Sequence, residues 1–397
     1  MCQIPEKSPN LFSRVPHRDS NRNIFYKKRE ALSYSHFINE PGLFLSKDWL
    51  KNSKTGLLIW LLFFVTSIAS AQKKEFDKRK FFKDDRLIEM TLVTDFKKLI
   101  KEKLNDNYRQ NFLPATITCI FPDSTKITEK VEIRSRGKYR REEFYLPPIM
   151  VNFKTPDAVS LKKLGRLKLV WPSDDKSYDE QLVLKEYLVY KIYNLLTEKS
   201  FRVRLVRMTS RDINEKIRPR SSYAFFIEAI DDLASRNSCV EVQSVRFHTE
   251  RTNRDLTTMV SLFEYMIGNT DFAIPLYRNI KLMRSKEDSL LPPYVVPYDF
   301  DYSGLVNAEY AIPPPELPIA TVRDRLYRGF PRTMEELQST IHIFRSQRQA
   351  IYSLIMNFEP LTMGNKKEMT KYLDEFFELT EKEKDVNNIF IKEARLE

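Results

Sequence analysis

The sequence predicts an α+β protein in which a twisted antiparallel sheet is followed by a mainly helical part. Two observations predict this fold class. Segments of strand length, rich in β-branched or alternating apolar residues, recur between residues 88 and 171. From residue 181 onward, several longer segments repeat apolar residues at intervals of three and four, which is the period of a helix.

The individual elements follow from these two periods. The predicted strands cover residues 88–93, 115–121, 131–136, 149–153, 166–171, 201–208, 223–230 and 294–300. The predicted helices cover residues 181–196, 256–267, 335–358 and 366–394, the last as one helix or two. This order divides the exported part of the chain into a sheet-rich lobe (72–230), a helix-rich lobe (231–360) and a C-terminal helical tail (361–397).

Composition supports a large core and argues against two common nucleotide-binding folds. The 397 residues include 27 Phe and 19 Tyr, but only 8 Gly. Neither a G-x-G-x-x-G nor a G-x-x-x-x-G-K pattern occurs, which argues against the ordinary dinucleotide-binding fold and the P-loop NTPases. The four histidines are scattered without the spacing of a zinc site.

The formal net charge of +12 does not by itself predict a nucleic-acid partner. Residues 1–54 hold ten Lys/Arg against five Asp/Glu, and in the rest of the chain basic residues are interleaved with acidic ones. Because no single basic cluster stands out, we expect a solvated basic surface and no bound nucleic acid.

Residues 55–72 carry no charge and read as a signal peptide. Lysines precede this apolar run, and Ala69-Ser70-Ala71 forms a small-x-small cleavage pattern at its end. We therefore expect residues 55–71 to be removed and the protein to be periplasmic or extracellular. The polar extension 1–54 suggests a start codon assigned too far upstream. The alternative is an uncleaved single span, which requires about 20 apolar residues; the membrane would then be contacted only through this leader.

Two cysteines, Cys119 and Cys239, follow the cleavage site. In an oxidising compartment they can form one disulfide, or they can remain as two buried thiols.

Polar residues that could bind a cation gather between residues 268 and 305. Asp299 and Asp301 are two positions apart at the end of an apolar strand, a spacing that places both carboxylates on one face. Asn279 adds a neutral oxygen, and Asp271 precedes it. Hard cations prefer such oxygen ligands, and the order Asp, Asn, Asp is the one used in kinase-type phosphoryl transfer. The alternative is a turn held by Asx hydrogen bonds.

Five segments in this order resemble the spore-coat-protein-H-like kinases, an atypical branch of the protein-kinase-like fold. They are residues 133–137 (IRSRG), 151–154, 183–196, 223–228 with the following Asp pair, and the Asp271, Asn279, Asp299-x-Asp301 series. The resemblance covers roughly residues 131–305 and implies an atypical protein-kinase-like fold. Two departures are an eight-residue step from Asp271 to Asn279, where ordinary protein kinases have five, and Arg278 where many members carry His.

The resemblance implies a role for each matching residue of the metal site. Asp271 would be the catalytic-loop aspartate. Asn279 and Asp299 would hold Mg²⁺ at the nucleotide phosphates, with Asp301 as a second ligand or a loop anchor.

It also implies a nucleotide-binding set. Lys154 would contact the phosphates and pair with Glu186, Arg136 is the alternative phosphate contact, and Glu228 would face the adenine.

Two functions follow as expectations. The first is an exported kinase-like phosphotransferase that uses Mg²⁺ and ATP on an unknown protein or small-molecule hydroxyl acceptor. The second is a non-catalytic relative that serves as a binding or scaffold protein of the cell envelope.

Overall fold

The computed structural model describes residues 78–105, 110–137, 141–142, 144–174, 177–243 and 247–395. The predicted extension (1–54) and leader (55–71) lie outside the described residues. The chain from Lys74 onward forms one compact unit. None of the helices in its described part is both long and apolar enough to cross a membrane.

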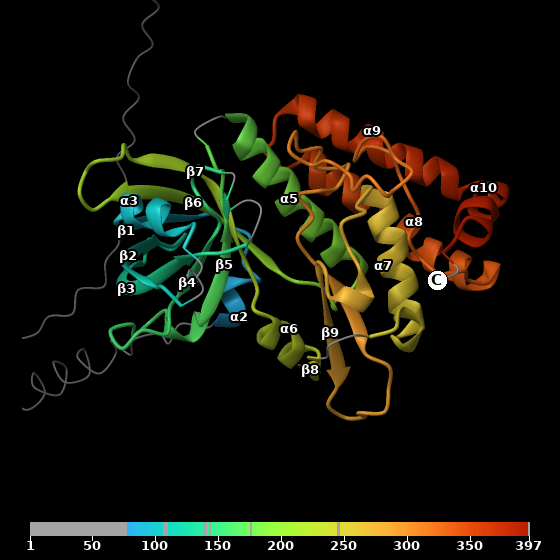
Figure 1. Ribbon diagram of the computed structural model, residues 1–397, viewed down its shortest axis with the longest axis horizontal. Helices are drawn as coiled ribbons and strands as arrows, with labels where there is room; N and C mark the ends of the chain where they lie inside the picture. The colour runs from blue at the N-terminus through green and yellow to red at the C-terminus, as the bar shows by residue number, and fades with distance from the viewer. Residues whose placement is uncertain are drawn as a thin grey trace, which may run out of the picture. The chain divides into compact units, whose positions relative to one another are not determined.

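Seven strands close into a barrel (Figure 1). In order around the barrel they are β1 (Ile88–Thr94), β2 (Leu113–Ile120), β3 (Lys126–Ser135), β4 (Ile149–Asn152), β5 (Arg166–Val170), β7 (Arg220–Ile227) and β6 (Val203–Asp212). Six of the seven neighbouring pairs are antiparallel. The seventh, β1 with β6, is parallel and closes the barrel.

Alternating side chains fill the barrel interior. In β2, for example, Leu113, Ala115, Ile117 and Cys119 are buried, while the residues between them are more exposed. Successive side chains of a strand point to opposite faces, so one apolar face of each strand enters the same core. The barrel therefore has a hydrophobic core of its own.

The fold class expected from the sequence is wrong. The prediction was an antiparallel sheet lobe followed by a helical, kinase-like lobe, whereas the structure is a closed, mixed seven-stranded barrel with additional helices. Alternation along β1 identifies its buried face but not its partner. Its parallel pairing with β6 joins Ile88 to Val206, 118 residues away, and this non-local contact converts an open sheet into a barrel.

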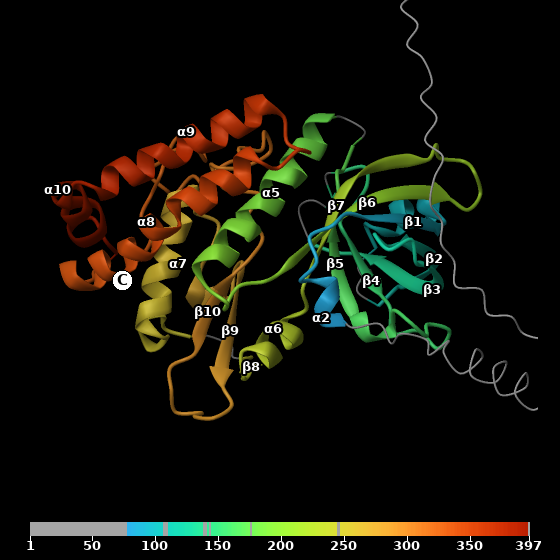
Figure 2. The ribbon, with the colours of Figure 1, turned by 180° about the vertical axis from the view of Figure 1, so that it is seen from behind.

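Helices and a small second sheet form the rest of the unit. Helix α5 (Ser177–Leu196) packs against β7 on one side and against α8 (Met334–Met356) on the other, and α8 also packs against α7 (Arg254–Ile267) and α9 (Met363–Thr380). The second sheet has the order β10 (Tyr294–Pro297), β9 (Ile280–Ser285), β8 (Cys239–Glu241), and β10 packs against α7. Figure 2 shows β9 and β10 beside α7, with α5 between the barrel and helices α7, α8 and α9.

The remaining described elements are short. They are α2 (Lys78–Phe81), α3 (Phe96–Glu102), η2 (Lys162–Leu164), α6 (Ile230–Arg236), η3 (Thr249–Arg251), η4 (Ile274–Leu276), α10 (Glu383–Asn387) and η5 (Asn388–Lys392).

Side-chain caps explain where the long helices begin. Asn253 accepts a hydrogen bond from the Leu256 amide at the start of α7. Thr333 and Glu336 form a reciprocal capping box at the start of α8. Each cap satisfies amides that have no partner within the helix.

The two cysteines are not bonded to each other. Both are buried free thiols. Cys119 lies in the barrel core and Cys239 in the larger core formed by the helices and the second sheet. Of the two alternatives left open by the sequence, the structure has the buried thiols.

Candidate active site

The end of α7 positions Asp271. The helix stops at Gly268, whose left-handed backbone (φ 67°) is a common C-terminal cap. Asn269 follows and is buried; its side-chain nitrogen donates to Oε2 of Glu264 at 2.9 Å, and its side-chain oxygen accepts from the Asp271 amide at 3.0 Å. The main chain of Asp271 is therefore fixed by Asn269, whose own side chain is held by Glu264 of α7.

A glycine pair anchors this loop to the turn after β10, which carries Asp299 and Asp301; the sequence had placed these two aspartates at the end of the strand itself. The Gly304 amide donates to the Gly268 carbonyl at 3.1 Å. A Cβ at either position would overlap the hydroxyl of Tyr372. Both positions therefore require glycine for close packing, which keeps the Asp271 loop beside residues 299–305.

Asn279 meets Asp271 despite the long spacing between them. Its side-chain nitrogen donates to the carbonyl of Asp271 at 2.8 Å and to its Oδ2 at 2.9 Å. The intervening residues form the short helix η4 and a β-bridge between Ala273 and Arg278, which brings the two ends of the segment together. The extra residues of this eight-residue step are thus accommodated in a compact turn.

The pairing of β9 with β10 brings Asp299 to the same place. Because Ile280 pairs with Pro297, the Tyr298 amide donates to the Asn279 carbonyl at 3.0 Å. The Asp299 amide in turn donates to the hydroxyl of Tyr190 on α5 at 2.8 Å. Asn279 (φ 52°) and Asp299 (φ 67°) both adopt the left-handed conformation, which is uncommon for residues other than glycine and concentrates at functional sites.

Three carboxylates, one of them that of Asp299, lie close together beside Asn279. One carboxylate oxygen each of Glu186, Asp299 and Asp301 lies within 4.8 Å of the others. Glu186, from α5, and Asp301 are buried, and Asp301 accepts a hydrogen bond from the hydroxyl of Tyr310 at 3.0 Å. Glu186 and Asp301 also line a cavity of about 10 Å³, which is room for about one water molecule.

The chemistry of this donor set fits a hard divalent cation. Ca²⁺–oxygen bonds of about 2.3–2.6 Å allow two ligands to be about 4.6–5.2 Å apart across the ion, and Mg²⁺ bonds of about 2.0–2.1 Å require them to close to about 4.2 Å. Because the three oxygens lie no more than 4.8 Å apart, they are near enough to one another to share one such cation.

Charged neighbours change the pKa values of two groups here. Burial raises the pKa of Asp271, Arg278 opposes the rise, and the negative charge of Asp299 adds to it. The pKa of Lys168 is lowered to about 8, chiefly by burial and then by the charge of Arg136, while Asp299 acts in the opposite direction. Arg136 and Lys168 are thus positive charges close to the acidic group.

Lys168 was missed by sequence reasoning. It lies on β5, and its ammonium is 4.2 Å from the ring centre of Tyr298. The only signal in the sequence is a lysine inside the otherwise apolar run Leu167–Trp171. The sequence of one strand does not indicate which charged residues from other segments will lie near a lysine in the middle of that strand.

Two predicted nucleotide-binding residues are placed differently. Lys154 is exposed just beyond β4, where its amide donates to the side chain of Asn152. Glu228 is buried at the end of β7, and its carboxylate accepts from the Arg236 guanidinium at 3.0 Å and from the Arg202 amide at 3.1 Å. Glu228 thus joins the end of β7 to α6, while Glu186, expected to pair with Lys154, lies with two carboxylates.

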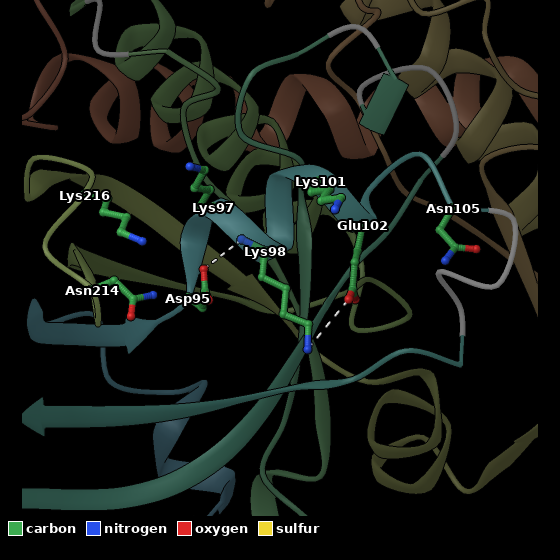
Figure 3. A pocket seen from close by; sticks show the side chains of 8 residues that line it. All are labelled: Asp95, Lys97, Lys98, Lys101, Glu102, Asn105, Asn214 and Lys216. Carbon is green, nitrogen blue, oxygen red and sulfur yellow. Dashed lines mark hydrogen bonds and ion pairs between the residues drawn. The ribbon is translucent and has the colours of Figure 1, made fainter.

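A second cavity of about 570 Å³ lies at α3 and the β6–β7 turn. Figure 3 shows that lysines are the commonest of its lining side chains and that Lys98 pairs with Glu102. The lining residues are Asp95, Lys97, Lys98, Lys101, Glu102, Asn105, Asn214 and Lys216. It shares no lining residue with the carboxylate group.

Comparison with known proteins adds no family to this description. The chain matches no protein-family model. It also matches no curated protein.

Proposed function

We propose that this protein is a divalent-cation-dependent phosphotransferase that uses Mg²⁺ and ATP on a hydroxyl group of a protein or small molecule. One observation carries the proposal: Asp271, Asn279 and Asp299, from three separated segments, converge beside Glu186 and Asp301. Phosphoryl transfer depends mainly on positioning and charge neutralisation. A group of carboxylates with two positively charged side chains nearby, Lys168 and Arg136, suits that chemistry.

Each side chain has a role in this proposal. Asp299, with Glu186 and Asp301, would hold the cation, and the side-chain oxygen of Asn279 is available to it because the amide nitrogen is directed to Asp271. When bound, Mg²⁺ would offset the negative charge of the phosphates. Asp271 would orient the acceptor hydroxyl and take its proton, a function that its raised pKa supports.

The positively charged side chains of Lys168 and Arg136 complete the proposed nucleotide site. Arg136 lies close enough to Lys168 to lower its pKa, and Lys168 also interacts with Asp299. Positive side chains beside a site for a divalent cation suit the phosphates of a nucleotide. We assign the phosphate contact to Lys168 and Arg136.

Ligand-induced thermal stabilisation tests the proposal. A ligand at about 100 times its Kd should stabilise the folded state by about 2.7 kcal/mol. We expect Mg²⁺ with ATP to raise the melting temperature of the parent and not of Asp299→Asn, since Asn tolerates the left-handed backbone but lacks the charge. The matched control is Asp288→Asn, an exposed residue in the β9–β10 connection, which should respond like the parent.

Two results would contradict the proposal. The first is a parent that no divalent cation or nucleotide stabilises, which would favour the non-catalytic envelope protein. The second is an Asp299→Asn variant that responds like the parent, which would place the binding site elsewhere.

We also propose that the protein is exported. The support is the apolar run with its Ala69-Ser70-Ala71 pattern, which lies outside the described residues. Intact-mass measurement of protein recovered from the cell envelope should show a chain beginning near Gln72. A retained leader in membrane fractions would instead support the single-span anchor.

A further inference from the structure

Arg278 holds its charge at the edge of the proposed active site. Its Nη1 is 3.5 Å from Oδ1 of Asp271, and 53% of its side chain is exposed. Its backbone is fixed because Ala273 and Arg278 exchange two main-chain hydrogen bonds, of 3.0 and 3.1 Å. The backbone of Arg278 is therefore held in place, while its side chain is largely exposed to solvent.

A second guanidinium, that of Arg328, contacts the main chain on either side of Asp271. Arg328 donates from Nη1 to the carbonyls of Thr270 and Phe272, the residues on either side of Asp271, the second at 3.1 Å. Its guanidinium also lies 5.6 Å from the ring centre of Phe272. Arg328 is thus engaged with the main chain, and its charge adds to the local positive potential.

The positive charges at Asp271 are not independent of one another. Burial lowers the pKa of Arg328, and the nearby guanidinium groups of Arg395 and Arg278 lower it further. Like charges held together in this way favour binding of an anion, which relieves their repulsion.

We propose that the acceptor of the phosphotransferase carries an anionic group, a carboxylate or a phosphate, next to its reactive hydroxyl, and that Arg278 binds this group. The inference rests on the proposed function and names the substrate class of the same site. Arg278 is the suitable residue because it combines an exposed head with proximity to Asp271, and guanidinium groups bind carboxylates and phosphates with two parallel hydrogen bonds.

Binding of such an acceptor would also free Asp271. In the absence of an acceptor, the guanidinium of Arg278 pairs with the carboxylate of Asp271, with Nη1 3.5 Å from Oδ1. A long, half-exposed ion pair such as this one contributes little and exchanges readily. When the acceptor's anion takes over Arg278, the Asp271 carboxylate becomes available to the hydroxyl.

The transfer itself balances without another reactant. A bond forms between the acceptor oxygen and the γ-phosphorus while the bond from that phosphorus to the β–γ bridging oxygen breaks. The nucleoside diphosphate leaves with the electron pair, and the acceptor proton moves to Asp271.

Peptide binding tests the inference separately from activity. We would measure the fluorescence anisotropy of three labelled serine peptides, flanked by Glu, by Ala or by Lys, with and without Mg²⁺ and a non-hydrolysable ATP analogue. The parent should bind the Glu peptide at least about tenfold more tightly than the Ala peptide, as expected for a charge-assisted pair. Arg278→Gln should lose this preference, and Arg278→Glu should prefer the Lys peptide.

The control variant is Lys101→Gln. It also removes one exposed positive charge, but from α3, where it lines the separate lysine-rich cavity. It should keep the preference of the parent for the Glu peptide. Loss of the preference in this variant would mean that net charge, and not Arg278, attracts the peptide, and the inference would be wrong.

Stabilisation by Mg²⁺-ATP separates failure of the inference from failure of the proposed function. Arg278→Gln should keep this stabilisation, and its loss would assign Arg278 to the nucleotide and overturn the inference. Equal binding of the Glu and Ala peptides by a parent that Mg²⁺-ATP does stabilise would overturn the inference alone. A parent that Mg²⁺-ATP does not stabilise would overturn the proposed function, and with it the inference.

Discussion

Asn279 donates two hydrogen bonds from one amide nitrogen to Asp271, one to its carbonyl and one to its carboxylate. The amide group thereby fixes both the main chain and the side chain of the proposed base. Its own backbone is left-handed (φ 52°), a conformation that Asn accepts more readily than most residues.

Substitutions of Asn279 should separate the contribution of its side-chain hydrogen bonds from that of its left-handed backbone. We expect Asn279→Gly to lose about 1 kcal/mol of unfolding free energy through the missing hydrogen bonds. Asn279→Ala should lose about 1 kcal/mol more, since Ala is strained at this φ. Chemical denaturation measures both, and an Ala variant at least as stable as the Gly variant would contradict the left-handed geometry. Both should lose stabilisation by Mg²⁺-ATP.

Glu264 should make the stability depend on pH. It is fully buried in α7, and burial raises its pKa to about 8, from 4.5. Between these two values the folded state keeps a proton that the unfolded state has released, so stability falls as the pH rises through this window. The total loss is roughly 3 to 5 kcal/mol.

The variant Glu264→Gln should remove this loss, because a neutral side chain at this position does not titrate. Urea denaturation at pH 5, 7 and 9 should show the variant gaining on the parent as the pH rises. Glu335→Gln, at an exposed position in α8, is the control and should follow the parent. Parallel curves for Glu264→Gln and the parent would show that Glu264 is ionised in the folded state.

Gly268 should not tolerate a side chain. Ala at this position would adopt a left-handed backbone and overlap the Tyr372 hydroxyl, so we expect Gly268→Ala to cost about 2 to 4 kcal/mol of unfolding free energy. Gly364→Ala is a matched control near the start of α9, where a Cβ meets nothing within 4 Å. It should stabilise the fold by about 0.5 to 1 kcal/mol. Similar melting temperatures for the two variants would contradict the close packing at Gly268.

Substitution of Lys168 and substitution of Lys154 should have opposite effects on nucleotide binding. Lys168 lies near Asp299, whereas Lys154 is exposed. We expect Lys168→Gln to lose most of the stabilisation by Mg²⁺-ATP and Lys154→Gln to keep it. The pKa of Lys168 is about 8, so nucleotide affinity of the parent should fall above that pH as the ammonium loses its proton. Titration calorimetry between pH 7 and 9 measures this fall, and its persistence in Lys168→Gln would mean that another group titrates.

Most elements of the described chain could be predicted from its sequence. The helix α5 was expected from its period, and each barrel strand overlaps a predicted one. Local periodicity is readable because a strand or helix buries one face whatever its partner is. The order and closure of the strands could not be read, since the parallel contact of β1 with β6 depends on packing between distant segments.

The candidate site divides in the same way. Asp271, Asn279, Asp299 and Asp301 could be selected because polar residues of this kind clustered after apolar segments. Their surroundings could not be predicted. Glu186 was selected only as a partner of Lys154, and the structure instead places it, from α5, beside Asp299 and Asp301; Lys168, on a barrel strand, was not selected.

The sequence by itself determined the local elements and the residue types available for cation and phosphate chemistry, because these depend on side-chain periodicity and on functional groups. Only the tertiary structure decided that the strands form a barrel, that the two cysteines remain apart, and that Glu186 joins two aspartates and not a lysine. Those outcomes depend on which distant segments pack against each other, a free-energy balance over the whole core that no local pattern contains.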